Sequence, residues 1–286
     1  MSSSCLGVNS EDHLTTDFDG LSSRDDPVVA VVIPARNESA TVAEVVSSFR
    51  AILMSAGIVA LVVVVDDRSS DDTAVRARDA GADVVIPSGG TGGLAQAFRT
   101  GVITALTYDV THILHVDADG QYSPADALGL LDIVLNGADL AIGSRLWNRP
   151  ACMSRPRYFA NRLFSRAVAC LIGIPILDAQ SGYRVFTREL ADTCLISGTY
   201  TYTQEQVIRA AHLGYVVSFM PISFLPRSSG RSRLIVSVPT YAAHVLIAVW
   251  RLTNALGIGH LRLPACLIYA FVIECRDRHK LEGSTR

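Results

Sequence analysis

Short apolar runs alternate with amphipathic segments along the first half of the chain. Residues 28–33 form an almost continuous β-branched run, which is typical of a strand buried on both faces. A helical pattern then begins at Ser39 and ends at Gly57, a residue favoured just beyond a helix. The same alternation continues downstream. It predicts strands at 59–65, 83–86 and 111–116, a short helix that ends near residue 80, and a helix at 94–107.

Four strand–helix alternations of this length predict an α/β fold, with a mostly parallel sheet and helices on both of its faces. In such sheets, ligands bind beyond the carboxyl ends of the strands. Polar or glycine-rich clusters follow all four predicted strands, at 36–38, 66–67, 89–93 and 117–121. We therefore expect one functional site along this edge of the sheet.

The fourth cluster contains two carboxylates, Asp117 and Asp119, with one alanine between them. Across a turn, this spacing lets both side chains face one point, where oxygen ligands hold a hard divalent cation. Mg²⁺ or Mn²⁺ takes few protein ligands and completes its coordination with water and substrate phosphate oxygens. The pair is therefore a candidate metal site for a nucleotide diphosphate. The buried strand before it favours this hypothesis over two solvated surface carboxylates.

Two other clusters are less specific. Asp66 and Asp67 follow four consecutive valines, and they either cap the next helix or bind a base or ribose, with Asp66 nearer the strand. The glycine cluster offers backbone N–H groups to an anion at the start of a helix. Its spacing matches neither a dinucleotide-binding fingerprint nor a P-loop, so both of these cofactor classes are excluded.

Charge divides the chain into an acidic and a basic half, although the net charge is only −2. Residues 1–139 carry 20 acidic and 7 basic residues, whereas residues 140–286 carry 7 acidic and 18 basic ones. The near-neutral total argues against a nucleic-acid partner, and the division favours a cation and an anionic ligand that meet between the halves. Between residues 140 and 177 there are six arginines and no acidic residue, which fits phosphate binding as well as a solvated surface.

Six segments that follow one another along the chain carry a more specific signal. They are IPARNE (33–38), VVDDRSSDDT (64–73), VDADGQ (116–121), IGSR (142–145), DAQSGYRVF (178–186) and RSSGRSR (227–233). In this order they resemble glycosyltransferase family 2, in particular its dolichol-phosphate mannosyltransferase and polyprenyl-phosphate glucosyltransferase branch. Any one segment is unspecific, but the ordered set covers most of residues 28–234.

The resemblance implies a Rossmann-like GT-A fold and an inverting transfer of a sugar from a nucleotide-diphosphate sugar. It implies that a nucleotide is bound by Pro34, Arg36, Glu38, Val65, Asp66 and Asp117. It implies a metal and diphosphate held by Asp117, Asp119 and Gln121. The catalytic and acceptor-side residues would be Asp119, Asp178, Arg145 and Glu205, with Arg157, Arg231 and Arg233 at the acceptor phosphate.

The acceptor decides how much acid–base chemistry the site needs. A hydroxyl is a weak nucleophile and needs a positioned base, for which Asp178 or Glu205 would have to serve. A phosphate monoester has a second pKa of about 6, is already an anion at neutral pH, and needs arginines instead. We therefore expect metal-dependent transfer to a polyprenyl phosphate. Two alternatives stay open: a soluble hydroxyl acceptor, such as a specialised metabolite or saccharide, and a non-catalytic nucleotide-sugar-binding protein.

Composition also predicts the domain boundaries. Residues 1–26 are rich in Ser, Asp and Thr and lack both apolar periodicity and a cationic start, which predicts a disordered tail rather than a signal peptide. Residues 27–233 form the expected GT-A domain. In the remaining segment, 234–286, the two apolar stretches are shorter than the ~20 residues that cross a bilayer. They fit a helical extension on the membrane surface or helices of the core.

Six cysteines are scattered along the chain without a C-x-x-C pair. They match neither a zinc site nor a dense disulfide framework, which favours a reducing compartment. Together with the expected lipid acceptor, this predicts a cytoplasmic protein that is peripheral on the cytosolic membrane face.

Overall fold

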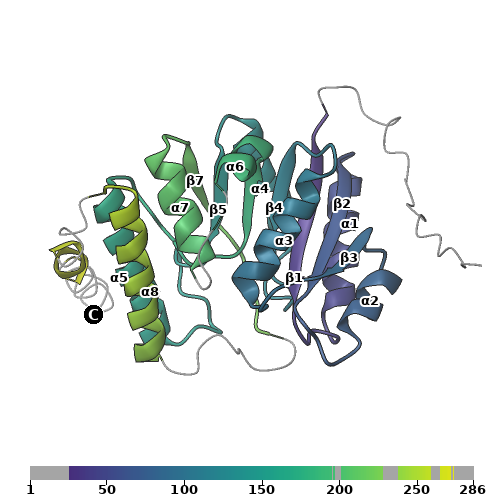
Figure 1. The fold of residues 1–286 in the computed structure, drawn as a ribbon, viewed down its shortest axis with the longest axis horizontal. Helices are drawn as coiled ribbons and strands as arrows, with labels where there is room; N and C mark the ends of the chain where they lie inside the picture. Colours follow the sequence, from purple (N-terminus) through teal and green to yellow (C-terminus); the bar gives the residue numbers. More distant parts are fainter. Residues whose placement is uncertain are drawn as a thin grey trace, which may run out of the picture.

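Strands and helices alternate over most of the chain (Figure 1). The computed structural model describes residues 26–194, 196, 201–227, 238–258, 265–271 and 273, so the predicted tail falls outside it except for Asp26. The strands are β1 (Val28–Ala35), β2 (Val59–Asp66), β3 (Val84–Pro87), β4 (His112–His115), β5 (Leu140–Ser144), β6 (Arg184–Thr187) and β7 (Val217–Pro221). The helices are α1 (Val42–Ser55), α2 (Thr73–Asp79), α3 (Leu94–Leu106), α4 (Asp126–Leu135), α5 (Arg155–Ile172), α6 (Arg188–Thr193), α7 (Tyr202–His212) and α8 (Val238–Ala255).

The seven described strands form one sheet in the order β3-β2-β1-β4-β6-β5-β7. The four strands predicted from the apolar runs, β1 to β4, are mutually parallel. β6 runs antiparallel to both β4 and β5, whereas β5 and β7 are parallel. The sheet is therefore mixed but mostly parallel, which confirms the predicted fold class. It also confirms that the polar clusters after β1, β2, β3 and β4 lie at one edge.

Alternate residues of β1 enter two hydrophobic cores, one on each face of the sheet. Ala30 and Val32 belong to the core that α3, α5, α6 and α7 cover, and Val29 and Val31 belong to the core that α1, α2 and α4 cover. Burial on both faces is the reason why this strand shows no apolar–polar alternation. α3 approaches the sheet closely at Gly101, where a Cβ would lie 2.4 Å from Val32 Cγ1.

The C-terminal helices lie at the end of the sheet that carries α5 and α7 (Figure 1). Val249 of α8 and Cys266 are buried in the same core as α3 and α5, so part of the predicted extension packs as core helices. Other apolar side chains of these segments face solvent: Ile247, Trp250, Ile268, Tyr269 and Phe271. Among the described residues, no helix has the length and apolar character that a membrane crossing requires.

Candidate active site

The turns after β1 and β2 interlock. The Asn37 N–H donates to Ser69 Oγ (2.9 Å), and Asn37 Oδ1 accepts from the Ser70 N–H (2.7 Å). Asn37 adopts a left-handed conformation (φ 52°), which Asn tolerates better than most residues. The Glu38 N–H donates to Thr73 Oγ1 (2.9 Å) at the start of α2. These contacts fix the edge at which the predicted nucleotide-binding residues lie.

The two aspartates at the end of β2 have different surroundings. Asp67 is buried, and its carboxylate accepts from Ser88 Oγ (2.8 Å) and from the Gly93 N–H (2.8 Å). Asp66 Oδ2 accepts only a long bond from the Ser69 N–H (3.3 Å), and Asp66 Oδ1 is buried with no hydrogen-bond partner among the described residues. A buried acceptor without a donor is costly. Asp66 is therefore the carboxylate of this pair that is available to a ligand.

Three further predicted nucleotide-side residues surround Asp66. Pro34 and Val65 are paired across β1 and β2, and both are buried in the sheet. Arg36 is largely exposed, and its guanidinium lies 3.8 Å from Asp67. Because the Asp67 carboxylate takes the Gly93 N–H at the start of α3, the glycine-rich segment binds the protein's own anion. A ligand phosphate would have to compete for that donor.

Asp117 and Asp119 lie in the turn after β4. Thr41 Oγ1 donates to the Ala118 carbonyl (2.7 Å), which fixes this turn to the start of α1, and the Gln121 N–H donates to Asp119 Oδ1 (3.1 Å). Burial and the negative charge of Asp119 raise the pKa of Asp117 to about 7. A carboxylate that is this costly to ionise gains stability from an added cation.

The donor set around Asp117 and Asp119 fits one hard divalent cation. The part of the chain that the structure describes has no cluster of three or more His, Cys, Asp or Glu side chains that would form a closed metal site. Mg²⁺ and Mn²⁺ need fewer protein ligands than such a closed site provides, because one or two carboxylates suffice when substrate phosphates and water complete the coordination. Two adjacent carboxylates, one of them poorly neutralised, match that requirement.

A guanidinium already supplies part of the positive charge at this pair. Arg227, in the segment after β7, donates through Nη2 to Asp119 Oδ2 (2.7 Å), and the same nitrogen lies 3.3 Å from Glu38 Oε1. It joins the turn after β1 to the turn after β4. We did not predict this residue for the site, although the segment that it begins, RSSGRSR, was one of the six family-like segments.

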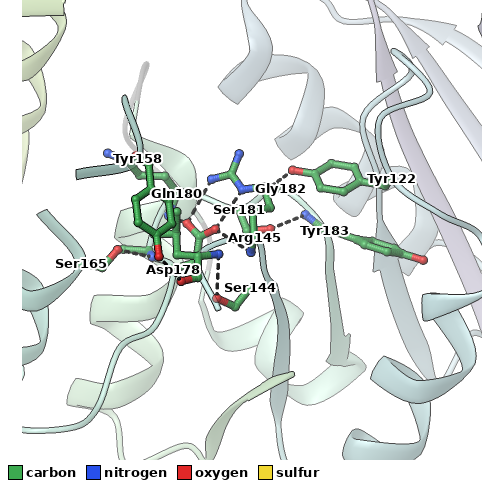
Figure 2. Close-up of polar contacts among 12 residues, drawn as sticks. Tyr122, Ser144, Arg145, Tyr158, Ser165, Asp178, Gln180, Ser181, Gly182 and Tyr183 are labelled. Carbon is green, nitrogen blue, oxygen red and sulfur yellow. Dashed lines mark hydrogen bonds and ion pairs between the residues drawn. The ribbon is translucent and has the colours of Figure 1, made fainter. Parts of the chain in front are cut away.

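Arg145 and Asp178 form a buried, two-point ion pair (Figure 2). Arg145 Nε donates to Asp178 Oδ2 (2.9 Å) and Nη2 donates to Oδ1 (3.0 Å), while the Arg145 backbone N–H donates to Oδ2 (3.2 Å). The Gln180 N–H adds a fourth donor (3.1 Å). Burial acts to lower the pKa of Arg145, but the charge of Asp178 outweighs it and the pKa lies above its usual range. Asp178 thus holds Arg145 charged and in one orientation.

The segment after Asp178 packs against the Asp117–Asp119 turn. A Cβ at Gly182 would lie 3.0 Å from Asp117 Oδ2, so glycine permits the close approach. The Gly182 N–H donates to Tyr122 Oη (3.1 Å; Figure 2), and the Gly182 carbonyl is bonded to His115 Nδ1. Burial lowers the pKa of His115 to about 3. The ring is therefore neutral, with its proton on the nitrogen that faces the carbonyl.

Three of the remaining predicted residues lie in described parts of the chain. Gln121 Nε2 donates to the Leu225 carbonyl (3.0 Å), and Arg157 lies exposed in the first turn of α5. Glu205 lies on α7, where its carboxylate accepts from Arg209 Nε (2.9 Å). Arg231 and Arg233 fall outside the described residues.

Besides Arg227, sequence reasoning missed Tyr122 and His115. Both flank the Asp117–Asp119 turn, and both bind the backbone of Gly182. His115 resembles an ordinary core histidine in the sequence, because the residues on either side of it are apolar. The only available signal for the two residues was their position next to the predicted metal site at Asp117 and Asp119.

The raised pKa of Asp117 predicts that stability depends on pH. Its folded-state pKa of about 7 lies above the ordinary value of 3.8, so its contribution to stability is present at low pH and is lost as the pH rises through 7. We expect the metal-free protein to melt about 5 °C lower at mildly alkaline than at mildly acidic pH. Asp117→Asn should remove most of this difference and raise the alkaline melting temperature. Differential scanning fluorimetry measures both effects.

A matched control for this prediction is Asp132→Asn, at an exposed position of α4. It should keep the wild-type dependence on pH, because its carboxylate lies away from the site. If Asp117→Asn also kept the wild-type profile, the burial of charge at Asp117 would be refuted.

The fold and the site together define a class of protein. A mostly parallel sheet, with an Asp-x-Asp turn after its fourth strand and polar turns after the first two, is the GT-A arrangement of nucleotide-sugar-dependent glycosyltransferases. Residues 30–195 match the profile of glycosyl transferase family 2, and the chain belongs to that family.

Similar proteins are found among curated sequences and solved structures. Glycosyltransferase AglJ of Haloferax volcanii is 36% identical over 204 residues, which cover 71% of this chain and 64% of that protein. The chain thus spans less than two thirds of this relative. Polyprenol monophosphomannose synthase of Mycolicibacterium smegmatis is 32% identical over 184 residues, covering 60% of this chain and 69% of that protein.

A similarity in fold to solved structures covers a larger share of this chain. Glucosyl-3-phosphoglycerate synthase from Mycobacterium tuberculosis, solved with Mn²⁺, UDP and glucosyl-3-phosphoglycerate, superimposes with a TM-score of 0.58 at 22% identity, over 81% of each chain. At this identity the likeness bears on the fold alone.

Proposed function

We propose that this chain is an inverting, metal-dependent glycosyltransferase that moves a hexosyl group from a nucleotide-diphosphate sugar to a polyprenyl phosphate. The observation that carries the proposal is the state of the two candidate bases. Asp178 is saturated by Arg145 and Gln180, and Glu205 is paired with Arg209. A hydroxyl acceptor needs an available base, whereas a phosphate monoester needs none. The relative named polyprenol monophosphomannose synthase supports the same acceptor class.

On the donor side, the nucleotide would lie across the ends of β1 and β2. The buried Asp66 Oδ1 would accept a hydrogen bond from the base or the ribose, and this contact would remove the cost of its present lack of a partner. Pro34 and Val65 would form the floor beneath the nucleotide, with Arg36 and Glu38 at its side.

The metal would be held by Asp117 and Asp119, with Gln121 beside them. When bound, Mg²⁺ or Mn²⁺ acts as a Lewis acid that stabilises the negative charge of the departing nucleoside diphosphate. Arg227 lies at the same carboxylate and adds a second positive charge for that diphosphate. The Mn²⁺–UDP complex of the M. tuberculosis structure supports this use of the fold.

On the acceptor side, arginines replace a general base. Arg145 is held by Asp178 in one orientation, and Arg157 lies at the N-terminal end of α5, where the helix dipole also favours an anion. A phosphate oxygen of the acceptor would attack the anomeric carbon as the bond to the diphosphate breaks, and no proton has to be removed. Arg231 and Arg233 would complete the site.

Location follows from the acceptor. Because a polyprenyl phosphate resides in a membrane, residues 27–233 would act as a GT-A domain at the cytosolic membrane face. Residues 234–286 would form a membrane-associated extension. The exposed Ile268, Tyr269 and Phe271 support this role, since they give that extension an apolar surface.

Two acceptors that differ only in one phosphate test the proposal. Purified protein is incubated with a panel of nucleotide sugars and Mn²⁺, together with a short-chain polyprenyl phosphate or the matching polyprenol. We expect metal-dependent product with the phosphate and none with the alcohol. Product with the alcohol, or with a soluble sugar acceptor only, would contradict the proposal, as would donor binding without turnover.

Arg157→Gln tests the acceptor side of the same reaction. It should raise the KM for the polyprenyl phosphate about tenfold and leave the KM for the nucleotide sugar unchanged, because one charge-assisted contact is lost. Arg78→Gln, at an exposed position of α2, is the control and should change neither constant. An effect of Arg157→Gln on the donor KM alone would place Arg157 on the other side of the site.

A further inference from the structure

A small hydrophobic cluster lies beside Arg145, and Phe224 connects it to the core that α1, α2 and α4 cover. It joins the loop after β5, the first turns of α5 and the segment after β7. Its members are Leu146, Met153, Tyr158, Phe159 and Phe224. The Phe224 ring also faces the Arg145 guanidinium, whose carbon lies 5.4 Å from the ring centroid. The cluster thus forms a packed base next to the proposed acceptor site.

Apolar side chains next to this cluster in the sequence are exposed. Trp147 is 57% exposed and Leu225 is 46% exposed. Cys152, which is also exposed, donates through Sγ to the carbonyls of Phe224 and Leu225 (3.6 Å each) and thereby joins the two segments. We call Trp147, Cys152 and Leu225 the docking rim. Trp147 and Leu225 directly follow Leu146 and Phe224 of the packed cluster and are exposed, and exposed apolar groups of this kind mark contact sites.

The docking rim lies in a basic stretch of the chain. Arg149 and Arg155 are exposed in the same loop and at the start of α5, and residues 140–177 include no acidic residue. Arg149 Nη1 donates to the Met153 carbonyl (2.7 Å), so its charge is held in the loop. A tryptophan with arginines around it is the composition of a headgroup-level membrane contact. Anionic headgroups supply the complementary charge.

We propose that the docking rim seats this chain on an anionic lipid surface, with Trp147 at headgroup level and Arg149 and Arg155 against the headgroup phosphates. The inference rests on the proposed function, because it would place the headgroup region next to Arg145 at the acceptor side. It assigns the contact to the loop after β5, whereas the second tryptophan, Trp250, lies exposed on α8.

The chain contains only two tryptophans, Trp147 and Trp250, and these report on the two surfaces separately. Trp250→Phe leaves Trp147 as the single fluorophore, and Trp147→Phe leaves Trp250. Each variant of the full chain is mixed with vesicles of phosphatidylcholine alone, or of phosphatidylcholine with phosphatidylglycerol. We expect the Trp147 emission to shift to the blue, and to be quenched by brominated lipid, with the anionic vesicles. This result supports the inference whatever Trp250 does.

Partitioning variants give the size of the effect. Trp147→Ala should lower the partition coefficient onto anionic vesicles roughly tenfold, the change expected for losing one buried large apolar side chain. Arg155→Gln should lower it about fivefold, since one cation near an anionic surface is lost. Arg78→Gln and Val75→Ala, at exposed positions of α2, should have no effect. Circular dichroism of each variant verifies the fold.

Three outcomes would overturn the inference. A shift of Trp250 without one of Trp147 would assign the contact to the C-terminal helices. No shift of either tryptophan would exclude a lipid contact of both surfaces. Protection of Trp147 from acrylamide at high protein concentration, without any vesicle effect, would assign the rim to a second copy of the chain. These outcomes leave the proposed transfer reaction untouched, because transfer to a short-chain polyprenyl phosphate in vesicle-free solution is measured independently; the second outcome also bears on the proposed membrane-associated extension.

Discussion

Asp119→Asn is expected to lower sugar transfer roughly a thousandfold, because the loss of a metal-held leaving group amounts to several kcal/mol of transition-state stabilisation. Asparagine has nearly the size of aspartate but carries no negative charge. The substitution therefore removes the charge of Asp119, which now accepts hydrogen bonds from the Gln121 N–H and from Arg227. The measurements are the initial rate with Mn²⁺ and the Mn²⁺ affinity in the presence of the nucleoside diphosphate. Both should fall.

Two controls make this result specific. Asp132→Asn removes a carboxylate from an exposed position of α4 and should leave the rate unchanged. Arg227→Gln removes the cation that competes for Asp119, so it should tighten Mn²⁺ binding in the absence of nucleotide. Metal-dependent transfer at the wild-type rate by Asp119→Asn would reject the proposed metal site.

Asp178→Asn is expected to destabilise the fold by about 3–5 kcal/mol, because it leaves the buried Arg145 without its counter-charge. The side chain of Asp178 is fully buried, and that of Arg145 is 7% exposed. Urea unfolding of the metal-free protein measures the change in the free energy of unfolding. The melting temperature should fall in parallel.

The matched control is Asp192→Asn, in an exposed pair with Arg188 on α6, which should cost less than about 1 kcal/mol. The double variant Asp178→Leu with Arg145→Met should regain much of the lost stability, since it removes both charges together. It should not regain transfer, because Arg145 itself is proposed to face the phosphates. A loss below about 1 kcal/mol for Asp178→Asn would contradict the account of this pair.

The sequence was most informative where burial on both faces of the sheet imposed continuous apolar runs. β1 and β2 are such runs, and the predicted and observed strands differ only at their ends. β6 was not predicted, because four residues with a buried arginine, Arg184, carry no apolar pattern. Arg184 is accommodated by backbone carbonyls, one close in the sequence at Ser181 and one 19 residues away at Thr203, and no local sequence pattern reveals the distant partner.

In the candidate site, too, the residues that a local sequence pattern marks were predicted, and those that only long-range contacts bring there were not. Asp117 and Asp119 were found because a carboxylate pair directly after a buried strand is a local pattern. The contact of Arg227 with Asp119 joins residues 108 positions apart, and that of Gly182 with Tyr122 joins residues 60 apart. These neighbours depend on the antiparallel insertion of β6 between β4 and β5, which places the segment before β6 beside the turn after β4. Local spacing carries no information on that pairing.

The two backbone bonds of Gly182 have a mechanical consequence. Its N–H and carbonyl are bound by Tyr122 and His115, one on each side of the Asp117–Asp119 turn. The turn that begins at Asp178 is therefore coupled to β4 and cannot swing away from it without breaking both bonds. Arg227, by contrast, is joined to the turns after β4 and β1 through side-chain ion pairs with Asp119 and Glu38. The turn that carries Asp178 and the Asp117–Asp119 turn are therefore expected to shift as one rigid unit, so that a displacement of either is passed to the other.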